Sequence, residues 1–348
     1  MRSVTSRNHW FAAGLAITTL AIAASSSFAE RGDGSSQGDT TTVSGKRSGE
    51  DIVSVVRFSA VTAGGKGFGV GNVTPVGGWR PPICWYEPRS AQEFAAHVEH
   101  MYDETINAPG QANYAKSSVG EFRHTYKDGE YQNYNLDKAD EGSWWVAVRD
   151  ENRRMEPEAQ ACDREPFWVE SGDTPEVPQA ITSQVLAELA YNRLHLPDTE
   201  LTLAPAGVTK VNLPTWAWLD KARFREVSVT ASLRVADINI QATTTAKPIS
   251  LKLEPGTDDA ATYPTSGICA LGVGDTIGQP YATGNADQTP PCGIKYLRSS
   301  GTGTYKLTAV ITWRVDWTGT GGVGGDLPDG VFGTTQDVTV QEIQAVNR

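Results

Sequence analysis

Several motifs that carry chemistry are missing from this sequence. It contains no C-x-x-C pair and no H-E-x-x-H, and its G-x-S-x-G match, at residues 34–38, lies in a Gly- and Ser-rich stretch without a strand or helix pattern around it. These patterns belong to structural zinc sites, zinc proteases and α/β-hydrolases, respectively. The sequence therefore supports none of these three classes, and we expect no cofactor and assign no catalytic residue.

The Gly-rich stretch Gly64–Gly71 also lacks the frames that bind nucleotides. A P-loop reads G-x-x-x-x-G-K-[ST], but Lys66 is followed by Gly67. In the dinucleotide frame G-x-G-x-x-G, counting from Gly65 puts Val70 at the position of the last glycine. We interpret the stretch as a flexible turn.

Positive charge and long apolar runs are scarce. Lys and Arg number 30 against 41 Asp and Glu, which gives a formal net charge of −11. Proteins that bind nucleic acids neutralise phosphates with a surplus of cations, so we expect no nucleic-acid partner. After the first 29 residues, no run approaches the roughly 20 apolar residues that span a bilayer, so we expect no membrane span.

The beginning of the chain has the pattern of a secretory signal peptide. Arg2 and Arg7 form a positive start, and the uncharged, mostly apolar run Phe11–Ala24 is too short to span a membrane. Residues 27–29, Ser-Phe-Ala, fit a small-x-small cleavage site. We therefore predict a signal peptide over residues 1–29 and a secreted protein, either extracellular or associated with the cell envelope.

All four cysteines follow the predicted signal peptide. An even number of cysteines in an exported chain favours disulfide bonds, and four cysteines allow three connectivities. The division into domains that we predict below favours Cys84–Cys162 and Cys269–Cys292, because each pair then lies within one domain.

Residues 30–50 are predicted to be a flexible tail, and residues 51–200 an irregular α+β domain. The tail has too little apolar surface to offset the loss of chain entropy. Within the domain, a capping box and an apolar stripe predict a helix over 90–106, and a second stripe predicts one from about 178 to 196. The aromatic segments 131–134, 144–148 and 167–169 are expected to be short strands or packed loops.

Residues 201–348 are predicted to form an all-β domain. Apolar and polar residues alternate over 227–235, 249–253 and 307–317, which is typical of antiparallel strands with one buried face. Several such strands with Gly- and Pro-rich connections indicate an immunoglobulin-like sandwich. We expect the stretch 255–303 to be a long loop held by a disulfide, and the Gly-rich loop 319–330 to be mobile.

One helical flank could bring metal ligands together. His97, His100 and Glu104 fall on the same side of the predicted helix, where two imidazoles and a carboxylate can meet one ion. A border position on the apolar face explains His97 equally well, so these three residues are weak candidates and no metal is assigned.

Tryptophan is the residue type that stands out. Trp216 and Trp218 share a face of one predicted strand, and Trp313 and Trp317 share a face of another. Exposed rows of this kind stack on sugar rings, but tryptophan also fills the core of β-sandwiches. Because both pairs lie on apolar faces, we favour a place in the core and keep carbohydrate stacking as the alternative.

Three runs resemble a family of secreted streptomycete-type actinobacterial proteins of unassigned function. They are PPICWYEP at 81–88, VNLPTWAWLDK at 211–221, and GDLPDG at 325–330 with GTTQDVTVQEIQ at 333–344. Members sometimes carry the labels enoyl reductase or ATP/GTP-binding protein, which the missing nucleotide frames do not support. The resemblance implies export but transfers no catalytic residue.

These observations predict a non-catalytic binding or assembly protein at the cell envelope or outside it. Its partner is unknown, and cell-wall polysaccharide or another envelope protein are the candidates. The alternative is a secreted hydrolase that acts on a polysaccharide or another polymer, because a pair of catalytic carboxylates leaves no sequence motif.

Cleavage of the signal peptide is directly testable. We expect the mature extracellular protein to begin at Glu30, because Ala29 ends the small-x-small site. Intact-mass analysis of the secreted protein measures this, and a membrane-bound form that retains residues 1–29 would contradict it.

Overall fold

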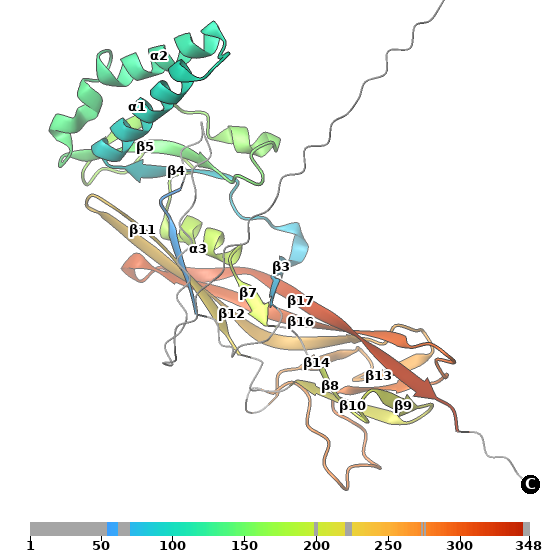
Figure 1. The fold of residues 1–348 in the computed structure, drawn as a ribbon. Coiled ribbons are helices and arrows are strands. Elements are labelled where there is room, and N and C mark those ends of the chain that lie inside the picture. Colours follow the sequence, from blue (N-terminus) through green and yellow to red (C-terminus); the bar gives the residue numbers. More distant parts are fainter. Residues whose placement is uncertain are drawn as a thin grey trace, which may run out of the picture. The chain divides into compact units, whose positions relative to one another are not determined.

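The computed structural model describes residues 54–61, 70–197, 201–219, 225–272, 274 and 276–343 (Figure 1). The predicted signal peptide, the tail and Gly64–Gly69 lie outside these ranges. The described chain is mostly β-structure in several antiparallel sheets, with three α-helices among its described elements. Within these ranges, no helix has the length and apolar character needed to cross a membrane.

The largest sheet contains eight strands. Its main path runs β1-β11-β12-β16-β17-β3, with every neighbouring pair antiparallel; β14 pairs with β12, and β9 pairs in parallel with β17. The strands are β1 (Arg57–Val61), β3 (Thr74–Pro75), β9 (Val208–Lys210), β11 (Val227–Val235), β12 (Ile238–Glu254), β14 (Ile268–Ala270), β16 (Tyr305–Gly319) and β17 (Gly324–Gln341).

Strand β16 runs through the middle of this sheet and confirms the predicted alternation. Its odd-numbered residues from Leu307 to Trp317 are buried. Both neighbouring strands contain a register shift: one follows Pro248 in β12, and one lies between Leu327 and Gly330 in β17. One extra residue exchanges the two faces of a strand, so each bulge keeps apolar residues on the buried side as the long strands continue.

Helix α3 (Ser183–Tyr191) packs on the large sheet, against β11, β12 and β16. Thr244 of β12 is completely buried and donates its hydroxyl to the carbonyl of Ala187 at 2.8 Å. A Cβ at Gly319 of β16 would lie 2.6 Å from the Cβ of Ser183, so the glycine permits the close approach of helix and sheet.

The prediction of a helix over 178–196 is too long at both ends. The N–H of Tyr86 donates to Gln179 O and the N–H of Ile181 donates to Tyr86 O, both at 2.9 Å, so residues 179–181 pair as an extended segment. The helix therefore begins after Thr182, whose hydroxyl accepts from the N–H of Val185. The residues after it form β7 (His195–Pro197), which pairs with β2 (Val70–Asn72).

The stretch 255–303 contains more regular structure than predicted. It contributes β14 to the large sheet and two strands to a four-stranded sheet of order β13-β15-β10-β8. That sheet consists of β8 (Leu201–Ala204), β10 (Pro214–Leu219), β13 (Ala260–Tyr263) and β15 (Gly293–Tyr296). The 319–330 stretch is likewise not a loop throughout: after the short 3₁₀ turn η4 (Thr320–Gly322), Gly324–Gly330 pairs with β16 as the first half of β17.

A three-stranded sheet, β4-β5-β6, carries the first two helices. Its strands are β4 (Cys84–Arg89), β5 (Gly142–Arg149) and β6 (Phe167–Glu170). Helix α1 (Ala91–Asn107) begins at the predicted capping box of Ser90 and Glu93, and Phe94 stacks on Trp144 of β5 with ring centroids 4.5 Å apart. Helix α2 (Asn113–Lys127) was not predicted.

The predicted aromatic segments divide between strands and turns. Residues 144–148 and 167–169 lie in β5 and β6. Tyr134 instead lies in the 3₁₀ turn η2 (Asn133–Lys138) at a positive φ of 56°, which turns its ring into the core beside Phe94. A further 3₁₀ turn, η1 (Val76–Gly78), precedes β4, and η3 (Pro157–Ala161) follows β5.

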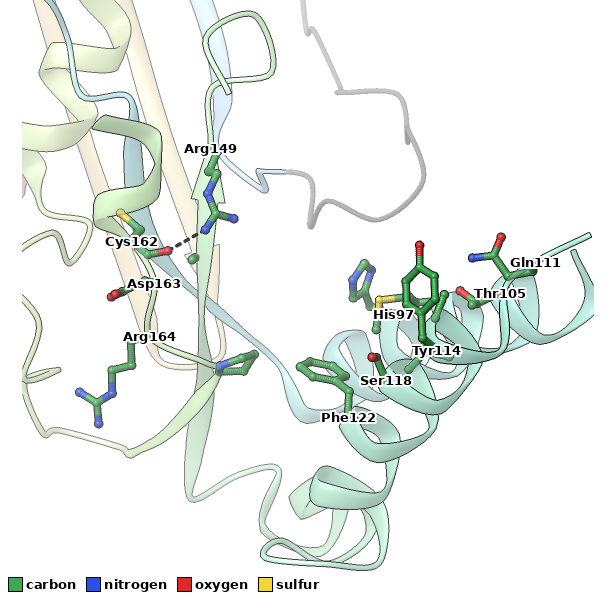
Figure 2. A pocket seen from close by; sticks show the side chains of 15 residues that line it. His97, Thr105, Gln111, Tyr114, Ser118, Phe122, Arg149, Cys162, Asp163 and Arg164 are labelled. Atoms are coloured by element: carbon green, nitrogen blue, oxygen red, sulfur yellow. Dashed lines mark hydrogen bonds between the residues drawn. The ribbon is translucent and has the colours of Figure 1, made fainter. Parts of the chain in front are cut away.

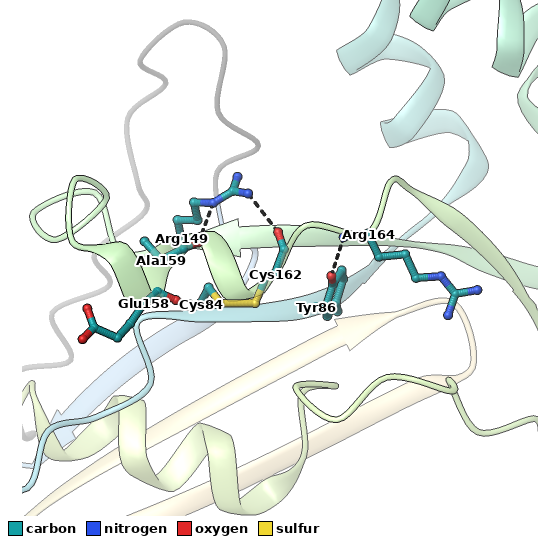
Figure 3. Close-up of a disulfide and its surroundings, with 7 residues drawn as sticks. All are labelled: Cys84, Tyr86, Arg149, Glu158, Ala159, Cys162 and Arg164. Carbon is teal, nitrogen blue, oxygen red and sulfur yellow. Dashed lines mark hydrogen bonds between the residues drawn. A yellow bond between two sulfur atoms is a disulfide. The ribbon is translucent and has the colours of Figure 1, made fainter.

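Both disulfides have the predicted partners. Cys84 is bonded to Cys162 with a Cα–Cα distance of 6.0 Å (Figure 3). Cys269 is bonded to Cys292 with a Cα–Cα distance of 5.6 Å. The first joins β4 to the segment after η3, and the second joins β14 to the residue before β15. The division at residue 200 stays a prediction; β1 and β3, which precede it, pair with β11 and β17, which follow it.

A buried carboxylate connects the small sheet to the segment that leads into β1. Glu87 of β4 has no exposed surface. It accepts hydrogen bonds from Ser54 Oγ, the Val55 N–H, Trp85 Nε1 and Arg89 Nη1, at 2.5, 2.9, 2.6 and 2.9 Å. These four donors replace the water that a buried carboxylate loses.

Removing this carboxylate is expected to destabilise the protein strongly. Glu87→Ala breaks a buried ion pair by removing the carboxylate that Arg89 Nη1 contacts, and we expect a loss of about 3–5 kcal/mol in the free energy of unfolding. Glu104→Ala removes an exposed carboxylate from α1 and should change stability by less than about 0.5 kcal/mol. Equal unfolding midpoints for the two variants in urea would contradict the assignment.

Candidate functional site

A groove of about 540 Å³ lies between helices α1 and α2 on one side and the end of β5 with segment 162–166 on the other (Figure 2). One wall is mainly apolar and the other carries charged groups. The lining residues are His97, Met101, Thr105, Gln111, Tyr114, Ala115, Ser118, Val119, Phe122, Ala147, Arg149, Cys162, Asp163, Arg164 and Pro166.

The helical wall is built by a stripe along α2. Tyr114, Ala115, Ser118, Val119 and Phe122 follow helical spacing and so share one side of the helix. Val119 is buried, whereas the ring of Tyr114 is 78% exposed at the mouth of the groove. The helical wall is therefore apolar and buried at Val119 and exposed to solvent at Tyr114.

Helix α2 is not predicted from the sequence because its N-terminus carries no recognisable capping signal. Ala112 occupies the N-cap position and makes no side-chain cap hydrogen bond. The remaining signal was the spacing of Ala115, Val119, Phe122 and Tyr126, which is that of one helical face. Without a predicted start, that spacing was not recognised as a helix.

The opposite wall is held by the first disulfide and by Arg149. The guanidinium donates from Nε to Ala159 O at 2.9 Å and from Nη2 to Cys162 O at 2.8 Å (Figures 2 and 3). These bonds, with the Cys84–Cys162 bridge, fix the chain that leaves β5 and returns along the groove.

Arg164 belongs to the same wall, but its side chain is oriented differently from that of Arg149. The backbone N–H of Arg164 donates to Tyr86 Oη at 2.9 Å, and its guanidinium lies over the ring of Phe167, 3.8 Å from the centroid. Figure 2 shows the side chains of Asp163 and Arg164 directed away from the helices. Of the two arginines in the lining, Arg164 is therefore turned away from the helical wall, and Arg149 is bonded to the backbone of the wall itself.

The structure does not gather the three weak metal candidates into one site. His97 lines the groove, whereas His100 Nε2 and Glu104 Oε1 lie 3.1 Å apart on the exposed side of α1. Across the residues that the structure describes, no three His, Cys, Asp or Glu side chains gather closely enough to hold a metal ion. The i,i+4 spacing favours a surface ion pair between His100 and Glu104.

Three of the four candidate tryptophans for carbohydrate stacking are buried. Trp216, Trp313 and Trp317 are 3%, 0% and 8% exposed, and Trp218 is half-buried. A ring without an exposed face has no surface on which a sugar can stack. Trp216, Trp313 and Trp317 therefore lie in the core, as we favoured. Of the four candidates, Trp218 alone remains partly accessible to solvent.

The chemistry of the described lining residues indicates which ligands the groove could hold. Its lining contains one carboxylate, from Asp163, and one imidazole, from His97. Glycoside hydrolysis commonly needs two carboxyl groups that flank the scissile bond. An apolar wall opposite a guanidinium instead matches a ligand that has an apolar part and an anionic or hydrogen-bonding part.

Comparison with protein-family models, with curated proteins and with solved structures finds no match to this chain.

Glu99 holds the two helices of the groove together. Its carboxylate on α1 accepts from Arg123 Nε and Lys127 Nζ of α2 and from the hydroxyl of Tyr134 in η2, each at 2.7 Å. The hydrogen bond from Arg123, followed by those from Lys127 and Tyr134, outweighs partial burial and lowers the pKa of Glu99 from 4.5 to about 2. The ionised carboxylate thus favours the paired helices.

This pKa predicts how stability depends on pH. Because the pKa is lower in the folded state, the contribution of Glu99 is complete above pH 4.5 and is lost as the pH falls toward about 2. Glu99→Gln should lower stability at neutral pH and flatten the loss between pH 4.5 and 2, as measured by thermal unfolding. Glu104→Gln, on the exposed side of α1, should keep the wild-type profile; the same slope in all three proteins would contradict the assignment.

Proposed function

We propose that this is an exported, non-catalytic binding or assembly protein of the cell envelope or the extracellular space, and that the groove beside α1 and α2 is its recognition site. The observation that carries the proposal is the groove itself, with an apolar helical wall facing the guanidinium of Arg149. Both walls are fixed by covalent or ionic contacts, as expected of a preformed binding site.

Export is supported by the pattern of the first 29 residues and by the two disulfides. All four cysteines are paired, and such bonds persist in oxidising compartments outside the cytoplasm. The resemblance of 81–88, 211–221 and 325–344 to secreted actinobacterial proteins points the same way. The antiparallel strands after residue 200 also support our interpretation of that part as an immunoglobulin-like sandwich.

Among the two candidate partners, we favour another envelope protein over cell-wall polysaccharide. The tryptophans that suggested sugar stacking are mostly buried, so the sequence signal for polysaccharide is weakened. The hydrolase alternative draws no support from the groove, whose lining brings a single carboxylate.

Filling the groove should remove binding without unfolding the protein. Ala115 lies on the groove side of α2 and is half-buried, so Ala115→Trp places an indole in the space that a partner would occupy. We expect retention of the purified protein on the insoluble envelope fraction to fall by about tenfold or more, equivalent to about 1.4 kcal/mol.

The matched control places the same side chain elsewhere on α2. Ser117 is exposed and does not line the groove, and Ser117→Trp should bind as the wild type does. Thermal unfolding checks that both variants fold. Retention of a folded Ala115→Trp protein at the wild-type level, or no retention of the wild type, would refute the proposed site.

A further inference from the structure

Strand β5 extends beyond its partner β6 at the groove. β6 pairs only with residues 142–145, whereas β5 continues to Arg149. The chain enters β6 from Pro166, which has no N–H to donate and lines the groove. Residues 146–149 of β5 therefore pair with β4 along one edge of the strand and face the groove along the other edge.

The hydrogen bonds of β4 show which backbone groups of β5 face the groove. Tyr86 uses its N–H and C=O on residues 179 and 181, so it directs them away from β5, and Ala147 opposite it forms a non-hydrogen-bonded pair. The N–H of Asp150 donates to Ile83 O at 2.8 Å, which gives Arg149 the same orientation as Ala147.

Ala147 and Arg149 thus present their N–H and C=O groups on the groove side. In the described part of the chain, no backbone hydrogen bond to these groups is found on that side. The two residues alternate along the strand, about 6.6–7 Å apart, which is the spacing that an added strand requires. Free edge groups of this kind pair readily with another extended chain.

We propose that the groove binds an extended peptide that adds to the free edge of β5 and carries an acidic residue. This deepens the proposed function, on which it rests, by naming the class of ligand. Alternate residues of the peptide pair with the backbone of Ala147 and Arg149, and an apolar side chain packs against Met101, Val119 and Phe122.

The acidic residue is assigned from charge complementarity. Arg149 uses Nε and Nη2 to hold the wall, which leaves Nη1 to donate to a carboxylate of the peptide. Two arginines and one aspartate line the groove, so its charge is opposite in sign to that of the chain as a whole. The helical wall also leaves room for only one added strand beside β5. This edge therefore differs from a fully exposed edge, to which further strands could add.

A peptide selection on the intact mature protein tests the proposal. A displayed library of random peptides about ten residues long is selected on the wild type and counter-selected on Ala115→Trp. We expect enriched sequences with apolar residues at alternate positions and one Asp or Glu. The best peptide is then synthesised, and its affinity is measured by calorimetry.

Backbone methylation of that peptide separates strand addition from other modes of binding. N-methylation at every second residue, where the N–H points to β5, should weaken binding by about tenfold or more, and methylation at the intervening residues by less than about threefold. Replacing the acidic residue by its amide should weaken binding by about fivefold. All these changes are made in the peptide, so the fold of the protein is untouched.

Three outcomes would overturn the inference: no peptide enriched over the Ala115→Trp protein, methylation effects without alternation, or occupation of the groove only by a second copy of the chain. If Ala115→Trp abolishes envelope retention and no peptide is enriched, the ligand class is wrong and the proposed site stands. If retention is also unchanged in that variant, both proposals fail.

Discussion

The fold around β4 depends on one buried negative charge. Glu87 has no contact with solvent, and four donors from the chain and from Arg89 compensate for its desolvation. Two of these donors belong to residues 54 and 55, directly before β1, which pairs with β11 in the largest sheet. The hydrogen bonds of Glu87 therefore connect the three-stranded sheet to the segment that enters the largest sheet. Breaking them would leave a buried carboxylate unpaired, which is costly.

Each wall of the groove is fixed by contacts with the residues that support it. The Cys84–Cys162 bond and the two hydrogen bonds of Arg149 fix one wall, and Glu99 with Arg123 and Lys127 fixes the other. None of these contacts spans the groove. Tyr126 of α2 does connect the two walls, because its hydroxyl donates to Pro166 O at 3.0 Å. A groove whose walls are already fixed can accept a ligand without first losing its own packing, which lowers the cost of binding.

The sequence predicted the elements whose signals are local. The capping box of Ser90 and Glu93 marked the start of α1, and alternation marked β11 and β16. Prediction failed where long-range pairing decides the structure: residues 179–181 are extended because they pair with Tyr86, and Gly324–Gly330 is a strand because β16 lies beside it. Neither partner is visible from neighbouring residues, since both are distant in the chain.

By itself, the sequence carried the signal-peptide pattern and the acidic charge, and it favoured the disulfide pairing that the structure contains. Only the tertiary structure decided that Trp216, Trp313 and Trp317 are core residues, because alternation shows that residues share a face but not what covers it. Only the tertiary structure formed the groove, because Met101, Val119, Ala147 and Pro166 come from separate segments. The free edge of β5 follows from where β6 begins and from the pairing of Tyr86, and both are properties of packed strands rather than of any one stretch of sequence.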